Sequence, residues 1–397
     1  MKTRILLLAL ATALLLTAAA LADTVIDGTG ERNIYPGDTG LNLVEVGVSP
    51  TTGRTLSGLN APDGASGLAV NGRYQPMLVQ IDNTDNGVGY RAPWGAIWAD
   101  VIFESPLRRE GHTRITLLFS DIIPDDVGPV RSARIGHVWL REEWGAGFVY
   151  YGQQEYHATN VKDEIARLGA DDAGVVFSGT LPAWSRYFYQ RRNLKSPHDK
   201  GADVAGLQAL IPEDYEVPNH AWLFTDEAAE GDSATVITVG WGRSDYRSVY
   251  TWSPSIGRYT RSVGDGSSQQ IYHDLDTGEA ITFANVIIQW VDMDWAQVTA
   301  PVMRIAGNAP FFVTWSDGPY IAQGNADFFM NGVHVAGYWR RDSMADRTVF
   351  YGPDGEEIQL QRGRTMVVMF PATERQLHEA SNKAPTLLEI QRSVSYR

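Results

Sequence analysis

The residues best suited to chemistry are two arginines in the stretch Gly128–Arg134, which reads GPVRSAR. Pro129 favours the first turn of a helix, because the N–H that proline lacks would have no partner there. Such a helix places Arg131 and Arg134 on one face of its first turn, where free N–H groups and the helix dipole attract anions. The pattern therefore predicts an anion site formed by both arginines and the Ser132 hydroxyl. The anion is either a ligand or a set of Asp and Glu side chains from elsewhere in the chain.

Five further cations gather later in the chain: Arg186, Arg191, Arg192, Lys195 and Lys200. Asp199 is their only acidic neighbour in the sequence, so this loop would form a positive pocket if it folded back onto Arg131 and Arg134. Arginine forks pair bidentately with phosphate, carboxylate and anionic glycans. In this interpretation, Lys195 and His198 close the pocket from the loop. The alternative is a solvated basic loop whose arginines pair with acids elsewhere.

Two carboxylates, Asp82 and Glu104, end strand-like runs. In α/β proteins, ligand sites lie at the carboxyl ends of parallel strands. The two groups could serve as an acid and base pair, or they could orient Arg114, Arg131 and Arg134. We favour the second role, because a buried network of arginines and carboxylates fixes geometry while adding little net stability.

His198 follows the turn-forming sequence Lys195–Pro197, and a loop histidine beside arginines can act as a general base near neutral pH. The alternative is a histidine that bonds only to backbone groups. His273 and Asp274 form a weaker pair, because adjacent side chains of a strand point to opposite faces. His198 and Asp82 are thus the catalytic candidates, and the sequence assigns a reaction to neither.

Metal and cofactor binding have little support in the sequence. Asp82–Gly87 has the sixth-position glycine of a calcium loop, but Pro93 stands where the bidentate glutamate belongs. The chain has no His-Glu-x-x-His zinc pattern, no Gly-x-Ser-x-Gly elbow and no Gly-x4-Gly-Lys phosphate loop. We therefore predict neither a metal nor a cofactor.

Strand-like and helical runs alternate in the first half of the chain, and strands dominate the second. The predicted strands of the first half are Pro76–Asp82, Trp98–Glu104, Thr113–Phe119 and Phe148–Tyr151, and the predicted helices are Val130–Trp144 and Asn160–Leu168. After an acidic linker at Asp226–Ser233, the predicted strands are Thr235–Val239, Ala284–Val291, Phe311–Trp315, Thr348–Tyr351 and Thr365–Phe370. This pattern predicts an α+β chain, with an N-terminal α/β domain at residues 56–228 and a predominantly β C-terminal domain at 229–397.

The first 22 residues have the pattern of a secretory signal peptide, with a predicted cut between Ala22 and Asp23. A flexible leader is expected at residues 23–55, and no later segment is long and apolar enough to span a bilayer. The chain has no cysteine, which excludes disulfides, cysteine nucleophiles and a lipid-bearing cysteine. Its formal net charge of −14 argues against nonspecific binding to nucleic acid or to anionic membranes.

Several short segments carry a resemblance to a known family: Pro76–Asn83, Ala99–Glu104, Thr113–Arg114, Val127–Arg134, Lys195–His198, His273–Asp274, Thr277–Gly278, Asn285–Gln289, Gly337–Trp339 and Gly363–Thr365. Over roughly residues 56–371, the chain resembles the YerB-like family of bacterial envelope proteins, a domain of unknown function with N- and C-terminal parts. The resemblance implies a two-part fold outside the cytoplasm and supplies no reaction. Many relatives look like lipoproteins, but this chain has no cysteine to acylate. Glu110–His112 replaces the glycine pair that usually precedes the Thr-Arg motif.

Three functions remain open at this point. The first is an exported, soluble binding or accessory protein with an anion pocket, whose partner is peptidoglycan, another anionic envelope ligand or an envelope protein. The second is a hydrolase or transferase that acts on an envelope glycan or phosphodiester. The third is an interaction module whose β domain docks a partner along a strand edge. The sequence does not predict an oligomeric state.

Overall fold

The computed structural model describes residues 23–26, 28, 48–55, 69–70, 73–83, 91–107, 113–155, 160–217, 221–242, 247–264, 269–298, 304–308, 322–376 and 391–397. Its helices are α2 (Ile135–Trp144), α3 (Val161–Arg167) and α4 (Val204–Gln208), with 3₁₀ turns η3 (Ala96–Trp98) and η4 (Pro182–Tyr187). The strands up to residue 225 are β1 (Thr24–Ile26), β2 (Ala69–Val70), β3 (Arg73–Tyr74), β4 (Met77–Ile81), β5 (Val101–Pro106), β6 (Thr113–Phe119), β7 (Gly147–Tyr150), β8 (Val176–Ser178), β9 (Phe188–Gln190), β10 (Lys200–Ala202) and β11 (Leu223–Thr225). The later strands are β12 (Asp232–Ser233), β13 (Val236–Gly242), β14 (Arg247–Ser253), β15 (Arg258–Gly264), β16 (Gln269–Ile271), β17 (Thr282–Phe283), β18 (Asn285–Val298), β19 (Arg304–Asn308), β20 (Ala322–Met330), β21 (Val333–Arg341), β22 (Val349–Tyr351), β23 (Gln359–Gln361), β24 (Thr365–Gln376) and β25 (Gln391–Tyr396).

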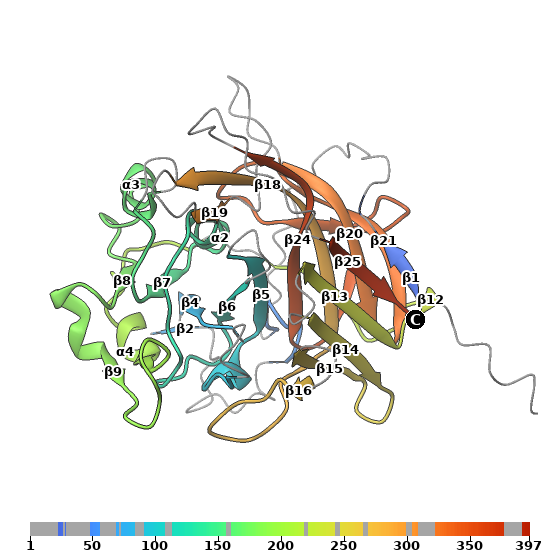
Figure 1. Ribbon diagram of the computed structural model, residues 1–397, viewed down its shortest axis with the longest axis horizontal. Coiled ribbons are helices and arrows are strands. Elements are labelled where there is room, and N and C mark those ends of the chain that lie inside the picture. The colour runs from blue at the N-terminus through green and yellow to red at the C-terminus, as the bar shows by residue number, and fades with distance from the viewer. Residues whose placement is uncertain are drawn as a thin grey trace, which may run out of the picture.

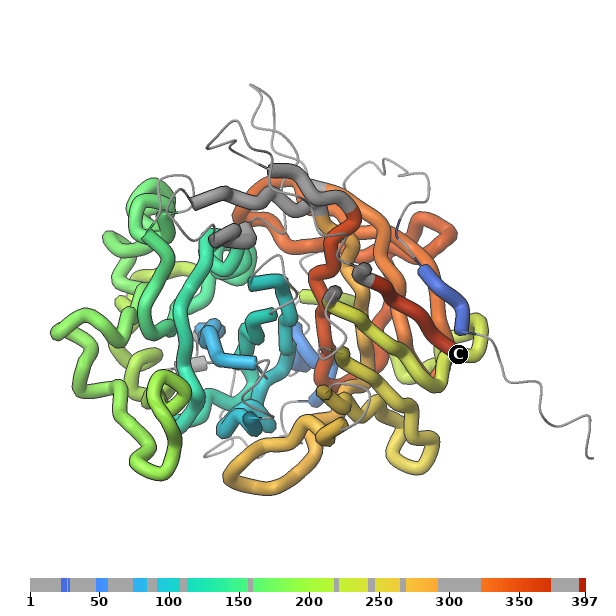
Figure 2. Tube along the Cα trace, viewed as in Figure 1, coloured from blue at the N-terminus to red at the C-terminus, as the bar shows by residue number. Residues whose placement is uncertain are grey.

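One large sheet runs through both halves of the chain (Figures 1 and 2). Its strand order is β12-β21-β20-β18-β24-β5-β6-β4-β7-β8, with β19 and β22 paired at its side. The two halves join where β5 lies parallel to β24, with Val101 opposite Thr365. Every residue of β4 and of β6 is buried, including the polar Gln80 and Arg114, as is typical of strands covered on both faces.

A second, smaller sheet packs against the C-terminal part of the large one (Figure 1). Its strand order is β1-β25-β13-β14-β15-β16, and β17 pairs with β15. The rings of Trp241 on β13 and Phe370 on β24 lie 5.1 Å apart between the sheets. Those of Phe329 on β20 and Tyr396 on β25 lie 5.6 Å apart. Aromatic side chains from facing strands thus form the core between these layers.

The predicted α+β fold class, with an N-terminal α/β domain, is wrong, because strands dominate the described residues of both halves. Parallel strands with crossing helices are confined to the edge formed by β4, β7 and β8, where α2 and α3 lie on the connections. Towards the middle of the sheet, β4, β6 and β5 are antiparallel neighbours. The sheet then continues into the C-terminal strands, so no separate α/β layer forms. The domain boundary at residues 228 and 229 stays a prediction.

Most predicted elements of both halves are present, but the predicted helix at Val130–Trp144 begins only at Ile135. The residues before it are extended, with Val130 bridged to Ile81 and Val127 to Ala202. Pro129 fits this path as well as a helix start, because the pairing uses its carbonyl and the N–H groups of Gly128, Val130 and Arg131. The predicted strand at Phe311–Trp315 lies outside the described residues.

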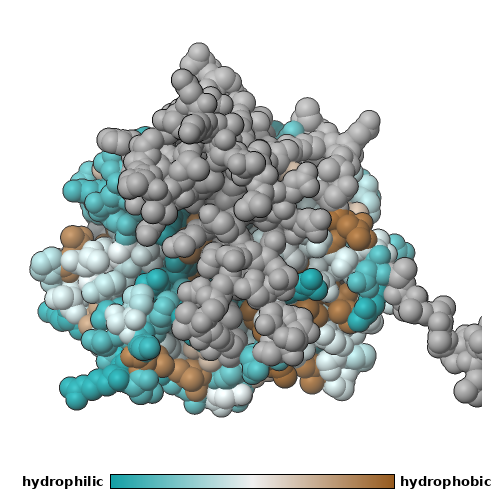
Figure 3. Space-filling view, in the orientation of Figure 1, coloured by the Kyte–Doolittle hydropathy of each residue, from teal (hydrophilic) through white to brown (hydrophobic). Residues whose placement is uncertain are grey.

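Parts of the predicted flexible leader belong to the fold. Thr24–Ile26 forms β1 and pairs with β25, and the hydroxyl side chains of Ser49, Thr51 and Thr52 are buried. The predicted signal peptide at residues 1–22 lies outside the described residues, and so does most of the leader. Among the described helices, none combines the length and the apolar composition that crossing a bilayer takes. On the face shown in Figure 3, the coloured hydrophobic residues form small separate patches.

Candidate anion site

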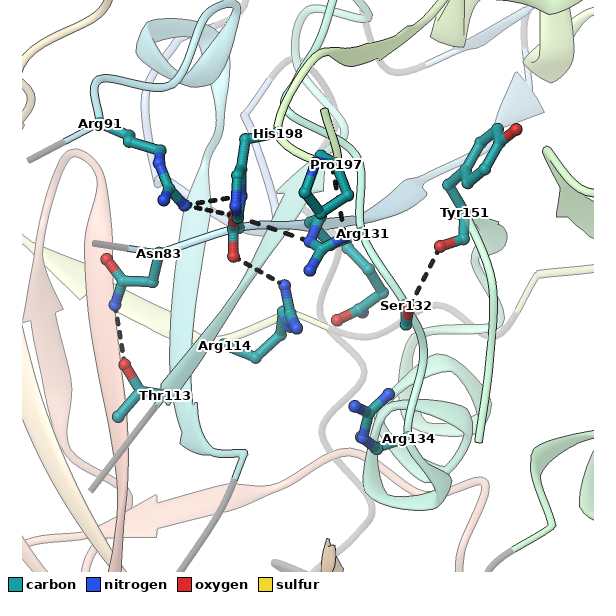
Figure 4. A network of polar contacts seen from close by, with 12 residues as sticks. Asn83, Arg91, Thr113, Arg114, Arg131, Ser132, Arg134, Tyr151, Pro197 and His198 are labelled. Carbon is teal, nitrogen blue, oxygen red and sulfur yellow. Dashed lines mark hydrogen bonds and ion pairs between the residues drawn. The ribbon is translucent and has the colours of Figure 1, made fainter. Parts of the chain in front are cut away.

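The site centres on Asp82, whose side chain is 10% exposed at the end of β4. Arg114 Nη1 lies 3.0 Å from its Oδ1, and Arg91 Nη1 lies 3.1 Å from its Oδ2. Arg131 Nε lies 3.6 Å from the same Oδ2, which also contacts His198 Nδ1. Figure 4 shows Arg91, Arg114, Arg131 and His198 converging on this carboxylate. One negative charge is therefore shared by three guanidiniums and an imidazole.

Backbone pairing brings these side chains together from distant parts of the chain. The N–H of Asp82 donates to Pro129 O over 2.8 Å, and the N–H of Arg131 donates to Gln80 O over 2.8 Å. The GPVRSAR segment therefore runs alongside β4 as an added strand. Its other side accepts the loop between β9 and β10, because the N–H of Val130 donates to Lys200 O over 2.7 Å. That loop carries His198 to the carboxylate.

The charge state of Asp82 follows from its surroundings. Burial alone would raise the pKa of Asp82, but the hydrogen bond from His198 and the charges of Arg114 and Arg131 outweigh it and lower the pKa to about 2. Asp82 is therefore a carboxylate throughout the physiological pH range. Because so weak a base takes up protons poorly at neutral pH, this favours the orienting role over general base catalysis.

Two groups of opposite charge contact the same ring nitrogen of His198. Asp82 Oδ2 contacts Nδ1, and Arg91 Nη1 lies 2.6 Å from the same nitrogen. A proton on Nδ1 forms a charge-assisted hydrogen bond with Asp82, whereas a bare Nδ1 would set its lone pair against a carboxylate oxygen. Arg91 Nη1 can only donate, so it makes the opposite demand on Nδ1. In the tautomer with the proton on Nδ1, the Nε2 lone pair is the basic position of the ring.

Arg131 is the cation of this site with most access to solvent, with 23% of its side chain exposed. Its Nη1 donates to Pro197 O over 3.3 Å, which ties it to the turn before His198. Its Nε makes no hydrogen bond and faces Asp82 at ion-pair distance. Pro197 and Asp82 thus hold the guanidinium in place without using all of its donors.

The predicted pairing of Arg131 with Arg134 is wrong. Arg134 is the residue that caps α2, with φ −129° and ψ 164°, and its Nη1 donates to Ala133 O over 2.8 Å. Figure 4 shows Arg134 beside the helix and apart from the Asp82 cluster. Ser132 also turns away, because its hydroxyl donates to Tyr151 O over 3.2 Å. The extended backbone causes this separation, since neighbouring side chains of a strand alternate in direction.

Glu104 does not hold Arg131 or Arg134, contrary to the prediction. It is fully buried and accepts hydrogen bonds from Asn83, from Thr113 and, over 2.9 Å, from Arg261 Nη2 of β15. The Glu104–Arg261 ion pair therefore joins the two halves of the chain rather than forming part of the Asp82 cluster. Lys195 lies exposed on the loop, where its backbone carbonyl accepts the N–H of His198.

The basic loop is partly neutralised by acids from elsewhere, as the alternative interpretation expected. Arg191 donates to both carboxylate oxygens of Asp276 over 2.7 Å and to Asp126 over 2.8 Å. Its guanidinium also lies 4.2 Å from the centroid of a Trp94 ring. Arg191 therefore fixes the loop to the body of the protein. Arg192, its neighbour in sequence, is exposed.

A buried carboxyl pair also escaped the sequence analysis. Asp100 Oδ2 accepts the N–H groups of Ser120 and Asp121, and Asp121 accepts the hydroxyls of Ser49 and Thr52. Burial raises the pKa of Asp100 well above its usual value, and the charge of Asp121 acts in the same direction. Burial raises the pKa of Asp121 as well, so we infer that the pair shares one proton.

No group of three or more His, Asp or Glu side chains within the described ranges is placed to hold a metal ion. The Asp82–Gly87 stretch, where the sequence argued against a calcium loop, lies mostly outside those ranges. Arg91 is the residue of the site that sequence reasoning missed. It has no motif around it, and only the fold shows that it reaches Asp82.

The chain matches two family models that together cover more than half of it. Residues 65–216 match "Protein of unknown function (DUF3048) N-terminal domain". Residues 237–367 match the corresponding C-terminal domain.

A curated protein and a solved structure are also similar. The protein named "Putative lipoprotein YerB" from Bacillus subtilis (strain 168) is 25% identical over 221 residues, which are 54% of this chain and 61% of that protein. The crystal structure of the YerB protein from Bacillus subtilis has a TM-score of 0.59 and 21% identity, and the match covers 81% of this chain and 95% of that one. At this identity, the structural match shows a shared fold.

Proposed function

Because this chain belongs to the DUF3048 family of proteins of unknown function, we propose that it is an exported binding or accessory protein of the cell envelope with an anion site at Arg131. The location is supported by the signal-peptide pattern of residues 1–22 and by the lipoprotein name of the Bacillus relative. The ligand we propose is peptidoglycan or another anionic polymer of the envelope.

The single observation that carries the anion site is the state of Arg131. Its side chain is partly exposed, and the carboxylate beside it is already shared with Arg114 and His198. An incoming carboxylate or phosphate can therefore pair with the guanidinium more fully than Asp82 does. Asp82 then has the role of holding Arg131 in a fixed orientation before the ligand arrives, which lowers the entropic cost of binding.

The test is calorimetric titration of the protein with soluble peptidoglycan fragments. Arg131→Ala should weaken saturable binding at least about tenfold, because it removes a charge-assisted contact. Arg192→Ala is the matched control, since it removes the same charge from an exposed position on the nearby loop. Equal affinities in the wild type and Arg131→Ala, or no binding by the wild type, would refute the proposal.

The contact between Asp82 and His198 supports a second candidate, a hydrolase or transferase acting on an envelope glycan or phosphodiester. With Nδ1 bonded to Asp82, the Nε2 lone pair of His198 could take a proton from water or from a hydroxyl group. Arg131 would stabilise the negative charge that develops. Incubating the protein with peptidoglycan fragments and analysing the mixture by mass spectrometry separates the two functions. New products that disappear in His198→Ala, while binding persists, indicate the enzyme.

A further inference from the structure

Three arginines meet at the junction of segment 48–55, the start of β15 and the turn that precedes β24. Arg54 belongs to the first, Arg258 to the second and Arg364 to the third. Gly363 shows how close two of them come, because a Cβ at this position would lie 3.2 Å from Arg258 Nη2 and 3.4 Å from Arg54 Nη2. The N–H of Gly363 donates to Thr52 O over 2.7 Å and fixes the turn against the segment.

The hydrogen bonds of these three side chains go to neutral backbone groups. Arg364 donates to the carbonyls of Ala99, Thr282 and Ile97. Arg258 donates to Gly257 O over 2.7 Å and to Arg362 O over 3.3 Å. The guanidinium of Arg54 makes no hydrogen bond in the described part of the chain.

None of the three forms an ion pair with a carboxylate of the described residues. The contrast is Arg362, next to the same turn, whose Nε lies 3.1 Å from Asp226 Oδ1. The carbonyl groups fix the positions of Arg258 and Arg364 without placing a negative charge against either guanidinium.

The charges repel one another. Burial lowers the pKa of Arg258, and the charge of Arg54 lowers it further. Burial also lowers the pKa of Arg364 to about 10, where Asp100 and Asp274 attract its charge and Arg54 and Arg258 oppose it. Like charges at such short range repel, so an anion among the three guanidiniums would relieve the repulsion.

We propose that Arg54, Arg258 and Arg364 form a second anion site, which takes a phosphate group, either free or carried on an envelope polymer. A phosphate group offers several oxygens to guanidinium donors that approach from different directions, whereas a carboxylate offers two in one plane. Arg54 is exposed and the other two are partly exposed, so the group can enter from solvent. This site shares no residue with the one at Arg131.

The experiment is titration with inorganic phosphate at fixed ionic strength in chloride buffer, using Arg131→Ala to isolate the second site. Adding Arg54→Ala to this background should weaken phosphate binding at least about tenfold. Because the guanidinium of Arg54 makes no hydrogen bond in the described fold, the variant should fold normally. Arg192→Ala in the same background is the charge-matched control and should bind as the parent does.

Two further measurements sharpen the test. Arg54→Glu supplies the missing carboxylate, so it should abolish phosphate binding and raise the unfolding temperature without phosphate. Dimethyl phosphate mimics a polymer diester: binding of this ion as well as inorganic phosphate points to a polymer, and binding of inorganic phosphate alone points to the free ion. No phosphate binding, binding that persists in Arg54→Ala, or acetate binding of equal strength would overturn the site. The binding of peptidoglycan fragments by Arg131→Ala tests only the site at Arg131, so the two proposals can fail independently.

Discussion

The charge of Asp82 makes a quantitative prediction. Asp82→Asn keeps the shape of the side chain and removes the negative charge that Arg91, Arg114 and Arg131 share, so it mimics the protonated acid. The pKa of Asp82 falls from 3.8 to about 2 on folding. By linkage this contributes about 2 kcal/mol to the free energy of unfolding at pH 7. The side chain is 10% exposed, so screening by solvent reduces this value little.

The lowered pKa of Asp82 determines how its contribution to the free energy of unfolding depends on pH. A carboxyl whose pKa is lowered by folding contributes its full stability above the unfolded value, and the contribution is lost as the pH falls through the folded value. The difference between wild type and Asp82→Asn should therefore be about 2 kcal/mol at pH 7, about 1 kcal/mol at pH 3 and near zero at pH 2. The charge effects of groups that do not interact with Asp82 cancel in this difference.

The assay is urea denaturation followed by tryptophan fluorescence at each pH, with the unfolding slope checked for constancy. Asp172→Asn is the control, because this carboxylate is exposed and should leave the free energy of unfolding unchanged at every pH. A wild-type advantage that is the same at pH 3 and pH 7 would refute the reasoning. So would Asp82→Asn being as stable as the wild type at pH 7.

Two further predictions concern buried carboxyl groups. Glu104→Gln should destabilise the protein by about 3–5 kcal/mol in urea denaturation, because it leaves the buried Arg261 charge unpaired, and adding Arg261→Met should recover much of the loss. Full stability of the single variant would contradict this role. Asp100→Asn should cost less than about 1 kcal/mol at pH 7, since the amide mimics the protonated member of the pair with Asp121. The wild type should lose stability as the pH rises from the unfolded to the raised folded pKa of Asp100, and the variant should show a smaller loss; an unchanged pH profile would contradict the shared proton.

Much of the local structure could be predicted from the sequence. The strand at Thr113–Phe119 matches β6 residue for residue, and Pro76–Asp82 contains β4, because short runs rich in β-branched and large apolar residues favour strands. The start of α2 was misplaced because Pro129 is compatible with both a helix start and an extended segment. Local pattern cannot decide between these, whereas pairing with β4 and β10 does.

The rest of the site could not be predicted, because its residues have partners far away in the sequence. Glu104 lies inside β5 rather than at the end of a strand, and its partner Arg261 is 157 positions away along the chain. Arg54, Arg258 and Arg364 likewise lie on three separate segments. Of the three, only Arg364 belongs to a motif named in the sequence analysis, Gly363–Thr365. Spacing along a sequence predicts neighbours within one element, and side chains that meet across a sheet leave no such signal.

The parallel pairing of β5 with β24 has a practical consequence for anyone who cuts the chain. A fragment ending between the halves would leave β5 on one piece and β24 on the other, each with a row of unsatisfied backbone groups along an apolar strand. Such edges recruit other chains and aggregate. The two regions that match the family models should therefore be expressed together. A pull-down with either half alone would capture proteins that pair with the exposed strand edge rather than a natural partner.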